Sequence, residues 1–491
     1  MGQTAQTCIG HWLRSAWRLF STDSCETLLE GVMQGDARVI KRILVVVAAA
    51  VGLVAPSLAY GQAPTIPDEV RQSVQARVDH AYNTGIVIGL VTPGGTTYSV
   101  YGSRDSTGAP VDEHTVFEIG SITKAFTGIL LADMVRRGEV ALDDPIHKYL
   151  PPTVTVPMRD GRPITMVDLA THTSGLPRLP TNLTPSDPAN PYADYTVEQL
   201  YAFLSGHTLR RDVGAEYEYS NYGFGLLGHV LALRAGTTYE ALIAARMANT
   251  LGMTSTGIAL TPDMRARLAQ GHVGTTAVSQ WDIPTLAGAG ALRSTAGDMV
   301  RFVRANMGLL TTPLLPAMEA SHEPRHRAGS DAMQIGLGWH ILTRDGRQIV
   351  WHNGGTGGYR SFVGFRRDGS RGVVVLTNSN RSADDIGYHL LDPGLPLEEV
   401  RVAVAVDPGV LAEYSGRYQL APGVVFDVTA EDGRLFAQLT GQPRFEVYPS
   451  SSTEFFYTVV DAQLSFVVEQ GKIVALTLHQ NGRDMRAAWI P

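Results

Sequence analysis

A serine and a lysine three residues apart stand at the start of a strongly apolar segment, and this arrangement constrains the fold more than any other feature. Lysine is rare in the chain, because only four of its 40 basic residues are lysines. One of them, Lys124, follows Ser121, and the apolar segment from Ser121 to about Val135 predicts a buried helix. Residues i and i+3 share one face of a helix, so the two side chains are expected to meet there.

Ser121 and Lys124 together have the parts of an activated nucleophile. A serine hydroxyl needs a neighbouring base to become reactive. A lysine amine can lose its proton when it is buried, whereas an arginine cannot. The pattern therefore predicts a catalytic serine. A serine and lysine at this spacing also arise by chance, and arginine-for-lysine bias is commonly compositional, so the motif alone leaves both interpretations open.

The N-terminal part of the chain predicts export. Arg38, Lys41 and Arg42 precede an apolar run at 43–54, and small residues follow at 55–59. A basic region, a short apolar region and small residues at a cleavage site are typical of a secretory signal peptide. An uncleaved membrane anchor is the alternative, but the run is short for a membrane span. We therefore expect a periplasmic or secreted protein without a stable membrane span after signal cleavage. Translation is expected to start near Met33.

Composition excludes several kinds of function. Both cysteines, Cys8 and Cys25, precede the predicted signal, so the mature chain should have neither disulfides nor cysteine chemistry. The net charge of −7 without a basic run gives no reason to expect a nucleic-acid partner. No H-E-x-x-H or comparable ligand spacing occurs in the sequence, so we expect no metal and no other cofactor.

Strand and helix patterns predict an α+β domain. An apolar run at 86–91 and a run rich in β-branched and aromatic residues at 96–101 flank Pro93-Gly94-Gly95, which is a hairpin signal. The segment from about 164 to 310 is mostly helical, and short strand patterns occur from 336 to 378. The two early strands and the late strands are expected to form one antiparallel sheet with helices on its faces.

The C-terminal segment has a different pattern. Two Asp-Pro-Gly sequences, starting at Asp392 and Asp407, mark a linker, and roughly eight short strand-like runs follow from about Glu413. Evenly spaced strands with turns at Asp432-Gly433, Gln470-Gly471 and Asn481-Gly482 predict a small barrel or sandwich. We expect a structural or substrate-gating appendage. The predicted division is 1–62 signal and upstream extension, 63–392 catalytic domain, 393–410 linker and 411–491 barrel domain.

Two further clusters lie in predicted loops. Tyr219-Ser-Asn221 precedes a glycine-rich helix start, and His352-Asn353-Gly354-Gly355 ends a strand in glycines that let backbone approach a substrate. Taken singly, Tyr219 could be a packing residue, His352 a hydrogen-bonded histidine and the glycines a simple turn. His172 lies in another loop and is expected to be structural.

The three clusters, in this order, resemble the serine penicillin-recognising superfamily. This superfamily includes DD-peptidases, class C β-lactamases, D-aminopeptidases and β-lactamase-fold esterases, and a related motif set has Ser-x-x-Lys first. The resemblance covers roughly residues 66–390. It implies a β-lactamase/transpeptidase-like fold, an antiparallel sheet flanked by helices plus a helical subdomain. The strand-rich C-terminal segment resembles the lipocalin-like barrels appended to some of these peptidases.

The resemblance also implies a role for each site residue. Ser121 would be the nucleophile that forms an acyl-enzyme, and Lys124 would transfer protons. Tyr219 would be the general base, provided that Lys124 or a charged His352 lowers its pKa from the usual value near 10. The backbone N–H groups of Ser121 and Gly355 would form the oxyanion hole. The residues implied in substrate binding are Asn221, His352, Asn353 and Gly354.

One departure bears on the substrate. His352 and Asn353 stand where class C β-lactamases usually have lysine and threonine, and a histidine is only partly charged near neutral pH. The implied activity is hydrolysis of D-amino-acid-containing peptides or related amides and esters, including peptides from the cell wall. The alternatives are a class C-type β-lactamase, a carboxylesterase or acyltransferase, and a non-catalytic protein that binds cell-wall fragments.

Overall fold

A computed structural model describes residues 63–480 and 482–491 of the chain. The predicted signal peptide, the expected start near Met33 and both cysteines lie outside the described residues. The described residues form one compact unit by their internal contacts. Among the described residues, none of the helices combines the length and apolar character needed to cross a bilayer.

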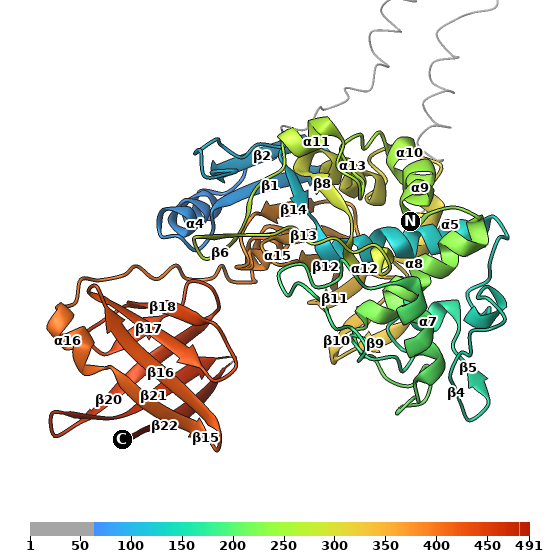
Figure 1. The fold of residues 1–491 in the computed structure, drawn as a ribbon. Coiled ribbons are helices and arrows are strands. Elements are labelled where there is room, and N and C mark those ends of the chain that lie inside the picture. Colours follow the sequence, from blue (N-terminus) through green and yellow to red (C-terminus); the bar gives the residue numbers. More distant parts are fainter. Residues whose placement is uncertain (1–62, 481) are drawn as a thin grey trace, which may run out of the picture. The chain divides into compact units, whose positions relative to one another are not determined.

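An eight-stranded antiparallel sheet is the centre of the first domain (Figure 1). The predicted N-terminal hairpin pairs with the last of the late strands, with Ile88 opposite Val375, so the expectation of one sheet is confirmed. In spatial order the strands are β2 (Gly95–Gly102), β1 (Gly85–Thr92), β14 (Gly372–Thr377), β13 (Arg360–Arg366), β12 (Arg347–Gly355), β11 (His340–Arg344), β10 (Ser330–Ile335) and β9 (His326–Ala328).

Strand β1 shows why both faces of the sheet are covered. Its side chains alternate between two apolar clusters, as a pleated strand requires. Ile86 and Ile88 pack in the cluster with helices α4 (Asp68–Asp79) and α15 (Asp384–Leu391). Val87 and Val91 belong to the larger cluster that contains helices α5 (Thr123–Arg136) and α13 (Ala296–Asn306). Helix α5 is therefore held in the core against the sheet.

A helical subdomain occupies the middle of the chain. Several of its helices begin at threonines whose side chains accept from the backbone three residues later, and Thr165 with Asp168 forms a complete capping box. Its helices are α6 (Met166–Ala170), α7 (Val197–Gly206), α8 (Asn221–Ala235), α9 (Tyr239–Ile243), α10 (Asn249–Leu251), α11 (Pro262–Ala266), α12 (Ala287–Gly290) and α14 (Leu315–Ser321), with single turns η3 (Ile146–Lys148) and η4 (Ala244–Ala248). Three small two-stranded sheets pair β3 (Val116–Glu118) with β8 (Arg293–Thr295), β4 (Met158–Arg159) with β5 (Arg162–Pro163), and β6 (Gly271–Val273) with β7 (Thr276–Val278).

The C-terminal segment is a closed antiparallel barrel, which decides between the two predicted architectures. Short helix α16 (Pro408–Glu413) precedes it. Two predicted turns are present, because Asp432 and Gln470 both have positive φ and each precedes a glycine with positive φ. The third predicted turn includes residue 481, which is not described. The strands are β15 (Gly416–Ala421), β16 (Val424–Glu431), β17 (Arg434–Leu439), β18 (Arg444–Pro449), β19 (Glu454–Phe456), β20 (Ala462–Glu469), β21 (Lys472–Gln480) and β22 (Arg483–Ile490).

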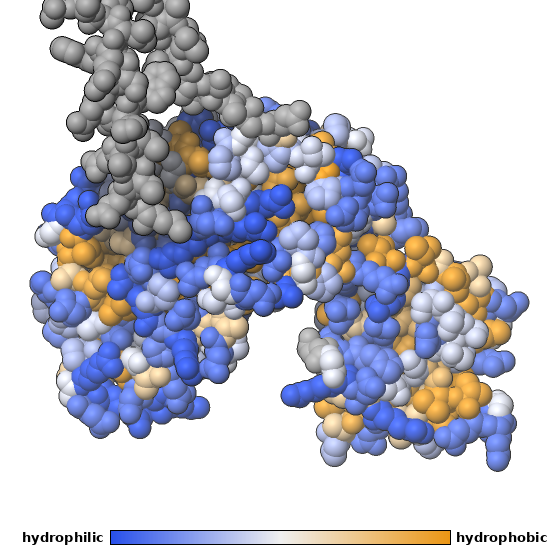
Figure 2. All heavy atoms as spheres, turned by 180° about the vertical axis from the view of Figure 1, so that it is seen from behind, coloured by the Kyte–Doolittle hydropathy of each residue, from blue (hydrophilic) through white to orange (hydrophobic). Residues whose placement is uncertain are grey.

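The barrel has an apolar core of its own, formed by side chains such as Tyr418, Leu464 and Leu476. The proposed residue boundaries between signal, catalytic domain, linker and barrel stay predictions. On the surface, Figure 2 shows hydrophobic residues interspersed with hydrophilic ones. The large exposed hydrophobics among the described residues are spread over several elements, from Val100 and Met158 to Val468 and Trp489.

Candidate active site

Ser121 lies in a single 3₁₀ turn, η2 (Gly120–Ile122), immediately before helix α5. The sequence predicted that the helix opens at Ser121, but regular α-helix begins at Thr123. The preceding Gly120 has φ +47, and a Cβ at this position would lie 2.7 Å from the backbone nitrogen of Gly355. A glycine is required here for both reasons. The close approach brings the backbone of Ser121 beside the end of β12, as a two-donor oxyanion hole needs.

Lys124 is completely buried and its amine faces the serine. Its Nζ lies 3.0 Å from Ser121 Oγ and donates to Asn221 Oδ1 (2.9 Å) and to the backbone oxygen of Ala289 (2.6 Å). Burial, assisted by the charge of Arg178, holds the pKa of Lys124 well below its usual value. A neutral amine can accept a proton from a hydroxyl, so the expected meeting of the two side chains has the geometry of a base and its nucleophile.

Helix α8 supplies the second cluster. Ser220 is its N-cap, and the Ser220 hydroxyl accepts from the backbone N–H of Gly223 at 2.8 Å. The backbone N–H groups of Asn221 and Tyr222 both donate to the backbone oxygen of Arg178. These bonds fix Asn221 at the first helical position, from which its side-chain oxygen reaches Lys124.

Tyr219 packs between an imidazole and a guanidinium. Its ring stacks on His172 with 4.5 Å between centroids, and the Arg178 guanidinium lies 5.0 Å from its centroid. Burial raises the pKa of Tyr219 to about 12, although its hydrogen bond with Ser121 and the charge of Arg178 act in the opposite direction. The phenol is therefore protonated at neutral pH. The lowered pKa that Tyr219 would need in order to act as a general base is therefore not found.

The third cluster lies at the end of β12. His352 is completely buried, its Nδ1 lies 2.5 Å from the backbone oxygen of Asn353, and burial holds its pKa well below the usual value. The ring is therefore neutral at neutral pH. Asn353 donates through Nδ2 to Asp384 Oδ2 at 2.5 Å. A Cβ on Gly354 would lie 2.0 Å from the backbone oxygen of Ile119, so glycine is required for this strand to approach the nucleophile turn.

A cleft of about 970 Å³ opens over these residues. Among the predicted site residues, those that line it are Ser121, Tyr219, Asn221, Asn353, Gly354 and Gly355. Lys124 and His352 are completely buried and stand behind its wall. Residues 459–461, between β19 and β20 of the barrel, also line the cleft.

Several cleft residues were not singled out from the sequence, namely Arg178, Tyr192, Trp281, His340, Arg360 and Asp384. His340 illustrates why. It follows Trp339 in a predicted strand and has no motif around it, yet its Nε2 lies 3.0 Å from the Tyr217 hydroxyl and burial lowers its pKa to about 4. The adjacency of His340 to the third cluster depends on the pairing of β11 with β12, which a single sequence does not specify.

His172 has a structural environment. Its Nδ1 accepts from the backbone N–H of Ser220 at 2.9 Å, and burial holds its pKa well below the usual value. A neutral ring in this position supports both Tyr219 and the start of α8. Among the described residues, no group of three or more His, Cys, Asp or Glu side chains is arranged to hold a metal ion.

The fold and this constellation define a serine hydrolase of the β-lactamase/transpeptidase class. The chain belongs to the Beta-lactamase family, whose sequence profile matches residues 70–391. A second profile, a domain of unknown function (DUF3471), matches residues 400–489, which include the barrel.

Relatives agree with this class. The chain is 30% identical over 336 residues to the D-alanyl-D-alanine-carboxypeptidase/endopeptidase AmpH of Escherichia coli (strain K12), covering 64% of this chain and 86% of that protein. It is 28% identical to a Beta-lactamase of the same organism, over 64% of this chain and 89% of the relative. Among solved structures, a class C beta lactamase from Rhodobacter sphaeroides superposes with a TM-score of 0.59 at 25% identity, covering 67% of this chain and all of that one.

Proposed function

We propose that this serine hydrolase is exported from the cell and cleaves D-amino-acid-containing peptides, or related amides and esters, through an acyl-enzyme at Ser121. The observation that carries the proposal is the contact of the buried Lys124 amine with Ser121 Oγ at the floor of a substrate-sized cleft. The relative named as a D-alanyl-D-alanine-carboxypeptidase/endopeptidase supports the substrate class. The basic and apolar N-terminal sequence supports export.

The proton path that we propose begins at Lys124. Ser121 Oγ attacks the substrate carbonyl carbon while its proton passes to the neutral Lys124 amine, and the carbonyl oxygen becomes an oxyanion between the N–H groups of Ser121 and Gly355. The leaving amine takes a proton from the Tyr219 phenol, which is then reprotonated through Lys124. Water releases the acyl group by the reverse route. Because the pKa of Tyr219 is raised, we assign the first proton transfer to Lys124 rather than to the tyrosine.

A class C-type β-lactamase is the second candidate, and the relatives named Beta-lactamase favour it. The third cluster argues against strong binding of a substrate carboxylate, that of a β-lactam included. His352 is neutral and buried, so it offers no positive charge to the carboxylate of a β-lactam. An esterase or acyltransferase has the same nucleophile and differs only in the cleft, so the substrates must decide.

The test follows the mass of the intact mature enzyme after addition of benzylpenicillin, with penicilloate measured in the same samples. A persistent adduct on Ser121 supports a peptidase that deacylates slowly, whereas rapid penicilloate release without an adduct favours the β-lactamase. An acetyl-D-alanyl-D-alanine peptide and a simple ester are assayed in parallel. Ser121→Ala is the control, and it should abolish hydrolysis while the protein stays folded. Turnover that is undiminished in Ser121→Ala, or binding without turnover in the wild type, would overturn the proposal.

A further inference from the structure

The Asn353 side chain is held in one orientation by a carboxylate outside the three motifs. Its Nδ2 donates to Asp384 Oδ2 at 2.5 Å. Asp384 is the first residue of helix α15, which follows β13 and β14 in the chain. Its own backbone N–H donates to Ser382 Oγ at 3.1 Å. One N–H of the Asn353 amide is therefore engaged within the protein.

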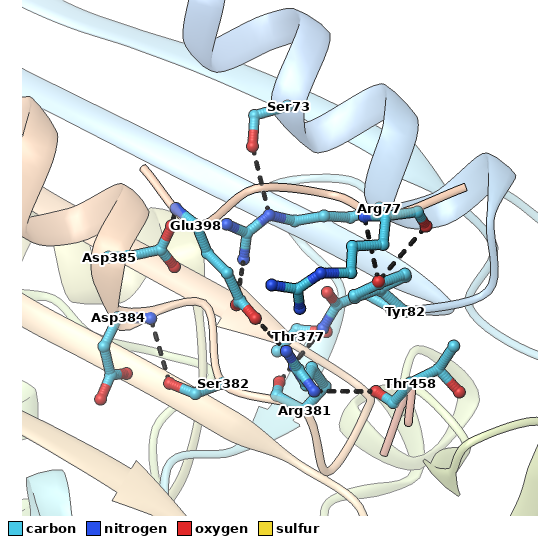
Figure 3. Close-up of polar contacts among 12 residues, drawn as sticks. Ser73, Arg77, Tyr82, Thr377, Arg381, Ser382, Asp384, Asp385, Glu398 and Thr458 are labelled. Carbon is cyan, nitrogen blue, oxygen red and sulfur yellow. Dashed lines mark hydrogen bonds and ion pairs between the residues drawn. The ribbon is translucent and has the colours of Figure 1, made fainter. Parts of the chain in front are cut away.

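Asp384 differs from the carboxylates beside it. Asp385 pairs with Arg77 at 2.5 Å, and Glu398 pairs with Arg381 and lies 3.9 Å from Arg77. Figure 3 shows Asp385 and Glu398 directed at these arginines, whereas the Asp384 carboxylate points away from that group. Burial raises the pKa of Asp384, and the hydrogen bond from Asn353 and the charge of Arg360 oppose this rise. Unlike these two carboxylates, Asp384 accepts a hydrogen bond from Asn353, which lines the cleft.

The consequence follows from the chemistry of an amide, which has donors on nitrogen and an acceptor on oxygen. Asp384 accepts from one of the two N–H groups on this nitrogen and so turns the NH₂ group towards α15, which leaves the carbonyl oxygen Oδ1 as the acceptor that Asn353 can offer to a substrate. Arg360 faces the same cleft from β13, where its Nε donates to the backbone oxygen of Asn380 at 2.8 Å and its Nη1 lies against Gly355. The Arg360 guanidinium would attract an anionic group of a substrate. Asn353 Oδ1, in contrast, is an acceptor and would bind an N–H group.

We propose that Asp384 is a positioning residue that keeps Asn353 Oδ1 towards the substrate, so that this point of the cleft selects an N–H donor, an amide or an ammonium group, over a carboxylate. The inference rests on the proposed function and concerns its substrate class. Without Asp384 the amide could turn and present its NH₂ group, which would reverse the preference at this point.

The test compares two peptides that differ in one group, acetyl-D-alanyl-D-alanine with a free carboxylate and the same peptide as its C-terminal carboxamide. The ratio of their kcat/KM values cancels general losses of activity. Asp384→Asn can donate to Asn353 Oδ1 and so reverse the amide. It should move the ratio towards the carboxylate peptide by about tenfold, the factor that one exchanged hydrogen bond supplies.

A double-mutant cycle separates positioning from charge. If Asp384 acts through Asn353, Asp384→Asn should leave the ratio unchanged in an Asn353→Ala background. A shift of the ratio that persists in the Asn353→Ala background would mean that Asp384 acts through its charge on Arg360, and would overturn the inference. An unchanged ratio in the Asp384→Asn single variant would overturn it as well. Asp385→Asn is the matched control at the adjacent carboxylate, and it should lower stability but keep the ratio.

Two outcomes keep this test distinct from that of the proposed function. Turnover of the peptides with an unaltered ratio contradicts the inference alone, whereas no turnover and no Ser121 adduct in the wild type contradicts the proposed function. Should Asp384→Asn fail to fold, Asn353→Ala by itself must lower the relative kcat/KM of the carboxamide peptide. Failure to do so overturns the inference.

Discussion

Lys124 Nζ lies 3.0 Å from Ser121 Oγ, and the same nitrogen is held by Asn221 and by the backbone of Ala289. These three contacts fix the position of the completely buried amine, and burial lowers its pKa well below the usual value. The serine therefore has a base that is already oriented before a substrate arrives, which is the condition for efficient proton transfer.

Replacement of this base should stop acylation. Lys124→Met keeps the length of the side chain but cannot accept a proton, and we expect the rate of adduct formation with benzylpenicillin at neutral pH to fall about 10²–10⁴-fold. The control is Lys148→Met, because Lys148 is exposed and pairs with Asp144. Acylation by Lys124→Met within tenfold of the wild-type rate would contradict the assignment.

The protonated phenol of Tyr219 should matter most for poor leaving groups. Tyr219→Phe keeps the stacking on His172 but removes the proton that we assign to the departing amine. We expect kcat/KM to fall about 10²-fold or more for an amide and less than about tenfold for a matched thioester. Equal losses for the two substrates would argue against a proton donor. Tyr217→Phe, which removes the neighbouring hydroxyl bonded to His340, is the matched control.

Glycine before the nucleophile should be needed for catalysis and not only for folding. Gly120 and Gly138 flank helix α5, and both have positive φ. An added Cβ would meet Gly355 at the first position and nothing within 4 Å at the second. Each alanine variant should lose about 1–2 kcal/mol of stability for its backbone conformation.

Gly120→Ala alone should also displace the oxyanion donors, with a loss of about 10²-fold in kcat. Unfolding in urea and steady-state kinetics of the two variants check this prediction. Comparable kcat values in Gly120→Ala and Gly138→Ala would show that the close approach to Gly355 is not needed for the reaction.

Stability should fall in acid because of histidines that are buried in the neutral form. His322 is 4% exposed, lies 2.8 Å from Asn306 Oδ1, and has its pKa lowered by burial to about 3. Between its unfolded pKa near 6.5 and about 3, the unfolded state binds a proton that the folded state does not. Protons therefore favour unfolding in this window, and stability is lost as pH falls.

His322→Gln removes this proton and can keep the bond to Asn306. The free energy of unfolding, measured in urea at pH 5.5 and 4.5, should therefore fall less steeply than in the wild type, by about 1.4 kcal/mol per pH unit. Parallel pH curves would contradict the prediction. The exposed His114 offers the matched control, His114→Gln.

Sequence patterns predicted much of the fold because they record local requirements. Two strand-like runs around Pro93-Gly94-Gly95 predicted the hairpin of β1 and β2, and its pairing with β14 in one sheet is confirmed. Turn residues predicted a barrel or a sandwich at the C-terminus, the resemblance implied a barrel, and the closed barrel of the structure confirms it. Closure depends on the pairing of β15 with β22, which lie about 70 residues apart.

Some residues of the candidate site were predicted from sequence motifs, and others are identified only by the structure. The order of its three motifs indicated Ser121, Lys124, Tyr219 and Asn221, because these chemical groups stand in short recognisable segments. The cleft residues Arg178, His340, Arg360 and Asp384 have no motif, and only packing brings them to the cleft. Asn353 was predicted to bind substrate, but which of its amide atoms is offered depends on Asp384, 31 residues away.

By itself, the sequence determined the class of chemistry, since three short motifs in a fixed order, with Ser121-x-x-Lys124 first, can be read from the chain. The tertiary structure decided the protonation states. Burial lowers the pKa values of Lys124 and His352 and raises the pKa of Tyr219, which changes the expected roles of a base and an anchor. The physical reason is desolvation, which depends on everything that surrounds a group and not on its neighbours in the chain.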